Sequence, residues 1–123
     1  MSIRGPSRRV RRKFLSSVNR LLILLILGSS PKPIYGYQIA KIIRELSEGK
    51  ITVNTSTLYS MLRKMEKDGL IRSIWRKSSL GPPRRYYFIT ESGSQLFTEI
   101  ITYLRIITKY AEKRKRIFEF KSD

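Results

Sequence analysis

The side chains best suited to chemistry in this sequence lie between positions 55 and 67 and carry hydroxyl, phenol and cationic groups. If this segment is helical, its polar residues fall on the face opposite its apolar ones. That polar face contains no acidic group and consists of Ser56, Tyr59, Ser60, Arg63 and Lys67. A helix face that meets only solvent normally mixes both signs of charge. The pattern therefore predicts a face that binds a polyanion.

Composition favours the same kind of partner and argues against catalysis. The 123 residues include 26 Lys and Arg but only 9 Asp and Glu, which gives a formal net charge of +17. A charge of this size is typical of proteins that bind nucleic acid or, less often, an anionic membrane surface. The sequence has no His and no Cys, so it lacks the commonest general base, metal ligand and nucleophile. We therefore predict no enzyme activity, no catalytic residue, no metal site and no cofactor.

The helix that would carry the polar face has its own start and stop signals. Asn54 or Thr55 can cap the first turn, and Gly69 stands where a left-handed residue ends a helix. Apolar residues recur at three- and four-residue spacings on the other face: Leu58, Met61, Leu62 and Met65. The segment is thus predicted to be an amphipathic helix with one buried and one binding face.

Two predicted strands follow this helix and form a hairpin. Residues 71 to 77 and 84 to 90 are rich in β-branched and aromatic side chains, and a turn-forming stretch from 78 to 83 separates them. Helix, strand, tight turn and strand is the order of a winged helix-turn-helix domain, with the hairpin as the wing. Four cations lie beside the tip: Arg76, Lys77, Arg84 and Arg85. We interpret them as DNA contacts; the alternative is an exposed hairpin whose charges keep its edge soluble.

The segments that precede this helix predict two more helices. Residues 36 to 46 carry Ile and Leu at helical spacing, whereas two prolines predict a loop over 29 to 35. The run Leu21 to Gly28 predicts a fully buried helix that ends at Gly28. Its seven consecutive apolar residues are too few to span a bilayer, which needs about 20. Its basic flank also resembles an export signal, but no small-residue cleavage site follows. We expect residues 51 to 53 to add a short strand to the wing sheet.

The two ends of the chain are predicted to differ in role. Residues 1 to 13 are rich in Arg and almost free of apolar side chains, so we expect a disordered basic arm that runs into a helix near Val10. This arm either reaches phosphates beside the main site or remains a solvated tail.

Residues 91 to 118 instead predict one long amphipathic helix. A helix of more than five turns exceeds what the domain needs as a cover, so we interpret its stripe as a dimer interface. The alternative is a helix that folds back on its own domain. The predicted interface consists of Leu96, Ile100, Tyr103, Leu104, Ile107, Tyr110 and Ala111.

Several segments together resemble the PadR family of transcriptional regulators: YGYQI (Tyr35 to Ile39), TSTLYSMLRKMEKDGLI (Thr55 to Ile71), Trp75 and GPPRRYYFITESG (Gly81 to Gly93). The resemblance implies a winged-helix dimer held by its terminal helices, with the third helix in the major groove and the wing beside it. It implies DNA roles for Tyr35, Tyr37, Thr57, Tyr59, Arg84 and Arg85. A small aromatic effector is implied by resemblance only, because nothing in the sequence marks a pocket for one. The chain departs from the family in its Ser-Pro-Lys-Pro loop, its more basic arm and its single C-terminal helix.

The predicted fold is mainly α with a small β-wing (α+β), organised as an arm over 1–13, a winged helix-turn-helix over 14–90 and a dimerisation helix and tail over 91–123. The predicted function is regulation of transcription, as a repressor, by a homodimer on a two-fold site of double-stranded DNA. We expect a cytoplasmic, nucleoid-associated protein without a membrane segment. The alternatives are an architectural protein that coats DNA with little sequence preference and, more weakly, an RNA-binding protein. The predicted DNA-binding residues are Tyr35, Tyr37, Thr55, Ser56, Thr57, Tyr59, Ser60, Arg63, Lys67, Arg76, Lys77, Arg84 and Arg85.

Overall fold

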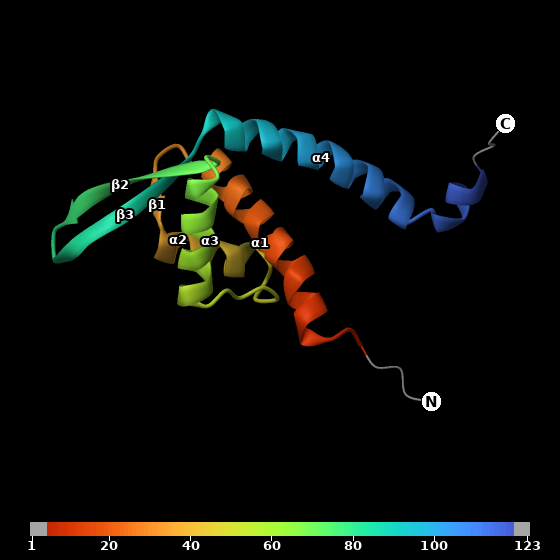
Figure 1. Ribbon diagram of the computed structural model, residues 1–123, viewed down its shortest axis with the longest axis horizontal. Coiled ribbons are helices and arrows are strands. Elements are labelled where there is room, and N and C mark those ends of the chain that lie inside the picture. Colours follow the sequence, from red (N-terminus) through yellow and green to blue (C-terminus); the bar gives the residue numbers. More distant parts are fainter. Residues whose placement is uncertain (1–4, 120–123) are drawn as a thin grey trace.

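The computed structural model describes residues 5–119 and contains three packed helices, a small sheet and one long projecting helix (Figure 1). The residues before and after this range, which include the ends of the predicted arm and tail, lie outside the description. Along the chain the elements are α1 (Arg8–Ser29), β1 (Ile34–Tyr35), α2 (Gly36–Leu46), α3 (Thr55–Lys67), β2 (Ile71–Ser78), β3 (Gly81–Ile89), α4 (Glu91–Ala111) and the 3-10 helix η1 (Arg114–Glu119). This order confirms the winged helix-turn-helix prediction.

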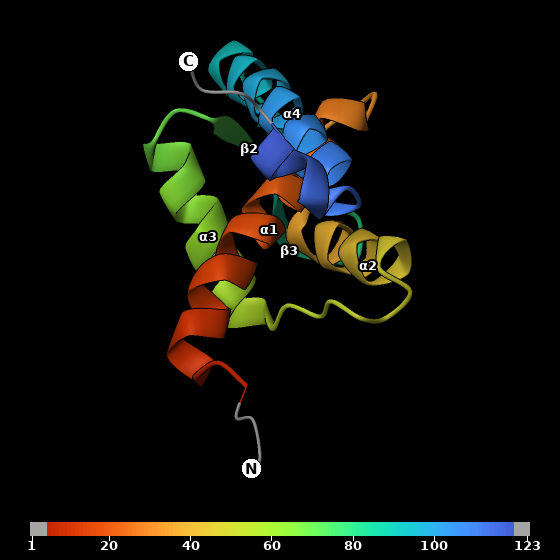
Figure 2. The same cartoon turned by 90° about the vertical axis from the view of Figure 1, so that its right-hand side faces the viewer.

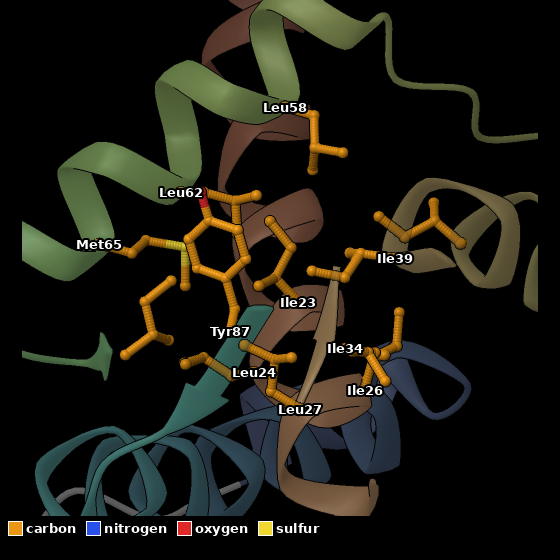
Figure 3. Close-up of a cluster of buried hydrophobic side chains, with 12 residues drawn as sticks. Ile23, Leu24, Ile26, Leu27, Ile34, Ile39, Leu58, Leu62, Met65 and Tyr87 are labelled. Atoms are coloured by element: carbon orange, nitrogen blue, oxygen red, sulfur yellow. The ribbon is translucent and has the colours of Figure 1, made fainter. Parts of the chain in front are cut away.

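The core lies where α1, α2, α3 and the sheet meet. Helix α1 contributes residues 23, 24, 26 and 27 to the core. Helix α2 contributes Ile39 and Ile43, and the apolar stripe of α3 faces them. Tyr87 points from β3 towards Leu62 and Met65 of α3 (Figure 3). These side chains fix the rotation of α3 about its own axis, and therefore decide which of its residues face outward.

Helix α1 departs from its prediction in extent and in burial. It begins at Arg8, because Ser7 caps it by accepting a 3.2 Å hydrogen bond from the Val10 amide. The basic segment from Arg8 onward is therefore helical and not a disordered arm. The helix is also not fully buried, since Leu25 is 40% exposed and Phe14 is 71% exposed. Only its C-terminal half packs against other elements, whereas its N-terminal turns extend past the core (Figure 1).

The sheet has three antiparallel strands in the order β1-β3-β2. Besides the two strands of the wing, the sheet contains β1, whose residues Ile34 and Tyr35 pair with Tyr87 and Tyr86 of β3. The prediction of a strand at residues 51 to 53 was wrong, as was the prediction that the loop extends to residue 35. Ile51 and Val53 pack against the core without strand pairing, so their burial and not a sheet explains their apolar character. Strand β3 begins at Gly81, three residues earlier than predicted, with a bulge opposite it in β2 near the tip.

Helix α4 begins against the end of α3. Thr90 caps α4 by accepting from the Gly93 amide at 3.1 Å, and its hydroxyl donates to the Gly69 carbonyl at 2.6 Å. The Thr90 amide donates to the Leu70 carbonyl at 3.1 Å. Gly93 is buried against that same carbonyl. These contacts set the direction in which α4 leaves the domain.

Beyond its first turns α4 projects away from the rest of the chain (Figure 1). It ends at Ala111 and not near 118, and the chain continues as η1 from Arg114 to Glu119. Along the predicted dimer stripe, four residues are half-buried (Leu96, Ile100, Leu104 and Tyr110) and three are exposed (Tyr103, Ile107 and Ala111). The first half of α4 contacts α1, whereas Tyr103, Ile106 and Ile107 are 53 to 61% exposed, so its own domain does not cover this part of the helix.

Candidate nucleic-acid interface

Helix α3 stands as a ridge between two grooves. Its start is capped by Asn54, whose side-chain oxygen accepts from the Thr57 amide at 2.8 Å and from the Ser56 hydroxyl at 3.1 Å. Its end is marked by Gly69, with a φ of 79° that favours glycine. The apolar stripe faces inward, so four polar side chains project outward along one line and are exposed: Ser56, Ser60, Arg63 and Lys67. In Figure 1 the wing lies on one side of α3 and the N-terminal half of α1 on the other.

The groove on the wing side is lined by aromatic and arginine side chains. They come from the start of α2, from α3 and from the wing: Tyr35, Tyr37, Tyr59, Arg63, Trp75, Pro83, Arg84, Arg85 and Tyr87. Gly36 makes this arrangement possible, because a Cβ at that position would lie 2.8 Å from Cζ and Oη of Tyr59. A larger residue at the centre of the Tyr-Gly-Tyr motif would push the Tyr59 ring away. The motif is therefore a packing requirement as well as a source of phenol groups.

Aromatic contacts order the exposed wall of this groove. The Tyr35 ring stacks on Tyr37 with centroids 6.5 Å apart and meets Tyr86 edge-on at 5.5 Å. The guanidinium of Arg84 lies 4.7 Å from the centre of the Tyr35 ring, and that of Arg76 lies 5.3 Å from the Tyr86 ring. Stacking of this kind restrains a long cation without neutralising it. Arg84 therefore keeps its charge available to a partner.

Arg85 has a different environment. It donates to Glu66 Oε1 at 3.0 Å and to the Ser73 hydroxyl at 2.7 Å, and Ser73 donates to Glu66 through both its amide and its hydroxyl. Within residues 5–119 this Arg85–Glu66 contact is the one ion pair. It joins α3 to both strands of the wing, so Arg85 lies over the sheet while Arg84 faces outward. Behind it, burial raises the pKa of the Tyr87 hydroxyl above its ordinary value, and the Arg85 charge partly opposes that shift.

The groove on the other side of α3 is lined mainly by cations and hydroxyls. Helix α1 contributes Arg8, Arg11, Arg12, Lys13, Leu15, Ser16, Asn19 and Arg20, and α3 contributes Ser56, Thr57, Ser60, Met61 and Lys64. Figure 1 shows the N-terminal half of α1 beside that of α3, and in Figure 2 it lies in front of it. The two grooves thus flank the outward face of α3, and both carry positive charge.

Comparison with known proteins identifies the family. A family model for PadR-like transcriptional regulators matches residues 23–99. The chain belongs to the PadR-like family. A solved PadR family regulator from Clostridium difficile is 32% identical, with a TM-score of 0.67 over 77% of this chain and 95% of that one. A PadR-like transcription factor from Bacteroides fragilis is 26% identical, with a TM-score of 0.70 over 85% of this chain and 97% of that one. An uncharacterised protein from Lysinibacillus sphaericus is 29% identical over 84 residues, which is 68% of this chain and 74% of that protein.

Membership of the PadR-like family makes the chain a DNA-binding transcriptional regulator and not an enzyme. Within the described residues, no helix is long and apolar enough to cross a membrane.

The structure distributes the predicted site residues of this PadR-like chain over the two grooves and their margins. Six line the wing groove (Tyr35, Tyr37, Tyr59, Arg63, Arg84 and Arg85), and three line the α1 groove (Ser56, Thr57 and Ser60). Lys67 and Thr55 lie exposed at opposite ends of α3, and Lys77 lies exposed near the wing tip.

Sequence reasoning missed Trp75 and Lys64 as groove residues. The spacing of residues 57, 61 and 64 places Lys64 on the flank of α3 that faces α1, so the helical pattern contained that signal. Trp75 gave no comparable signal, because its position depends on the pairing of β2 with β3.

Proposed function

We propose that this PadR-like protein represses transcription by binding a two-fold DNA site as a homodimer. The observation that carries the proposal is the outward polar face of α3, which stands beside the cationic wing groove. A major groove about 12 Å wide admits one α-helix, and a phosphate strand borders it on each side. The ridge of α3, with the wing groove beside it, fits a major groove and one of its bordering strands. Occupation of a promoter is sufficient for repression, so no further activity is required of the chain.

The roles of individual side chains follow from their positions. Ser56, Ser60 and Arg63 lie on the outward line of α3, where base edges would be read. Arg63 is the long cation among them and suits a bidentate contact with guanine. Arg84 faces outward on the wing and suits a backbone phosphate. Arg85 instead holds the wing against α3 through Glu66, so its contribution is to position Arg84.

The homodimer is supported by the exposed stripe of α4. Large apolar side chains that remain exposed along one helix face mark an interaction surface. A second copy of the same helix would cover this stripe on both chains. In dimeric helix-turn-helix proteins the two recognition helices enter successive major grooves about 34 Å apart, which predicts a pseudo-palindromic site.

Selection of bound fragments from random double-stranded DNA, followed by competition binding, tests this proposal. We expect a pseudo-palindromic motif that the protein prefers over random DNA by about 10³ or more at physiological salt. We expect Arg63→Ala to cost about 1–3 kcal/mol of binding free energy and to relax specificity at one position in each half-site. Arg44→Ala is the control, because Arg44 is an exposed arginine on α2 that lines neither groove.

Three outcomes would contradict parts of the proposal. The absence of any sequence preference would make the protein an architectural DNA-coating protein. Preference for structured RNA would remove DNA as the partner. A loss for Arg63→Ala that is uniform across all sequences would reassign Arg63 from base reading to a phosphate contact.

A further inference from the structure

The N-terminal turns of α1 carry a concentration of charge that the fold itself does not require. Five of the first six residues of the helix are cations, and no acidic residue precedes Glu45 in the sequence. These cations lie at the positive end of the helix dipole, where positive charge is unfavourable. Arg8 and Arg12 also form a like-charged pair four residues apart. Within residues 5–119, none of these five cations has an acidic partner.

Most of these cations face one side. Arg8, Arg11 and Arg12 fall at three- and four-residue spacings, and together with Lys13 they line the groove beside α3. Lys64 faces them from α3 across the same groove. Arg9 does not line it. The charge is therefore directed towards the flank of the recognition helix and is not distributed evenly around α1.

We propose that this groove binds the phosphate backbone on the side of α3 opposite to the wing, so that each subunit holds both DNA strands of its half-site. The proposal rests on the proposed DNA binding and extends it to the surface of α1, for which the sequence resemblance implied no contact with DNA. With α3 in the major groove, one DNA strand would run along the wing groove and the other along the α1 groove. Phosphate contacts of this kind fix the position of a recognition helix and add affinity without reading sequence.

An anionic membrane is the other polyanion that a basic helix can meet, but the position of the cations favours DNA. A helix that lies on a membrane places its apolar side in the bilayer and its cations at the rim. Here the cations instead line a groove shared with the hydroxyl face of α3, which includes Ser56 and Ser60. Because one surface continues from α1 to α3, a single ligand is expected to contact both helices.

The test compares Arg12→Ala with the matched variant Arg9→Ala, which removes the same charge from the same helix outside the groove. The dissociation constant of each protein for its selected DNA site is measured as a function of salt. A lost phosphate contact reduces the log–log slope by about 0.9. The substitution removes one such contact from each subunit of the proposed homodimer, so the slope should fall by about 1.8. The affinity that Arg12→Ala loses between 50 and 200 mM salt should then be about 12-fold smaller than the loss of the wild type. Arg9→Ala should keep the wild-type slope, and both variants should keep the wild-type sequence preference.

Two further measurements separate DNA contact from other roles. Hydroxyl-radical footprinting of a protein with Arg8, Arg11 and Arg12 all replaced by Ala should lose protection on one strand of each half-site while the protection due to the wing remains. Thermal unfolding without DNA should show no loss of stability in Arg12→Ala, since the change removes like-charge repulsion.

Equal slope changes in Arg9→Ala and Arg12→Ala would reduce the effect to general charge and overturn the proposal. Unchanged slopes and footprints in a protein that still selects its site would also overturn it, but would leave the proposed function intact. Failure of the wild type to prefer any DNA site would instead reject the proposed function. Binding of the wild type to vesicles containing phosphatidylglycerol, if Arg12→Ala abolished it without changing DNA binding, would assign the groove to a membrane.

Discussion

Replacement of Gly93 by alanine should destabilise the protein, although the same change usually stabilises a helix. Glycine inside a helix costs about 0.5–1 kcal/mol relative to alanine because it loses more conformational freedom on folding. Gly93 lies in the first turn of α4, where a Cβ would overlap the carbonyl oxygen of Leu70 and lie 3.0 Å from Cγ1 of Ile89. The obstructing atom belongs to the backbone, so rotation of a side chain cannot relieve the overlap.

The expected magnitude follows from the two opposing effects. Overpacking in a well-packed site costs about 1–3 kcal/mol, and occasionally more. Displacement of Leu70 also weakens the hydrogen bond that its carbonyl accepts from the Thr90 amide, and such a bond contributes about 0.5–1.5 kcal/mol. Subtracting the gain in helix propensity leaves a net loss of about 1–3 kcal/mol for Gly93→Ala.

Gly28 supplies the matched control. It also lies within a helix, and the nearest atom to a Cβ there is Cδ1 of Ile89 at 3.6 Å, an ordinary van der Waals contact. Gly28→Ala should therefore leave the stability unchanged or raise it by up to about 1 kcal/mol. The assay is urea unfolding of wild type and both variants at one fixed protein concentration, because association shifts apparent stability. A shift of the midpoint without a change of slope reports a change in stability.

If Gly93→Ala were as stable as Gly28→Ala, the close approach of α4 to Leu70 would not exist in solution. An equal loss in both variants would mean that the added methyl group, and not the overlap, causes the effect. Either result would mean that the contact between Gly93 and Leu70 does not set the direction of α4.

Three further predictions concern the dimer and the wing. Leu104→Glu places a charge in the middle of the α4 stripe, so sedimentation at micromolar concentration should show a monomer or an unfolded chain. The affinity of this variant for DNA should also fall steeply. A wild-type protein that sediments as a monomer would overturn the proposed dimer itself. Arg84→Ala should flatten the salt dependence of DNA binding by about one phosphate contact per subunit, with little change in stability. Arg85→Ala should instead cost about 1 kcal/mol of stability, since it leaves Glu66 and Ser73 without their cation at a partly exposed site. Similar results for the two arginine variants, in salt titration and in urea unfolding, would contradict the division of roles between them.

The elements that could be predicted from the sequence are those marked by nearby residues, such as helix caps and strand alternation. Asn54 and Gly69 delimit α3 through capping and left-handed geometry, and the alternation of residues on either side of the tip predicted the wing. Strand β1 was missed because two residues are too few to show a period, and its extended form depends on pairing with Tyr86 and Tyr87. The helical state of the basic segment was missed because a run of like charges is usually disordered; here the Ser7 cap starts a helix that the buried half of α1 continues.

The division of roles within the candidate site depends on tertiary contacts that no local pattern contains. Arg84 and Arg85 are adjacent and chemically identical, and alternation along a strand says only that they point in opposite directions. Their surroundings differ because Glu66, 19 residues earlier, is on the side that Arg85 faces. Gly36 likewise reads as a turn residue in the sequence, whereas its function in the fold is to leave room for the Tyr59 ring.

Two contacts, one towards each end of α3, position the helix proposed to read DNA relative to α2 and to α4, the helix proposed to form the dimer. Towards the start of α3, Tyr59 packs against Gly36 and sets the helix relative to the start of α2. After its end, the Gly69 and Leu70 carbonyls hold Thr90, and the absence of a side chain at Gly93 allows α4 to leave at its observed angle. Because α4 carries the proposed dimer stripe, a change at residues 69–70 or 90–93 would rotate both recognition helices relative to the two-fold axis. Such a change should alter the preferred spacing between half-sites before it alters the sequence read within each half-site.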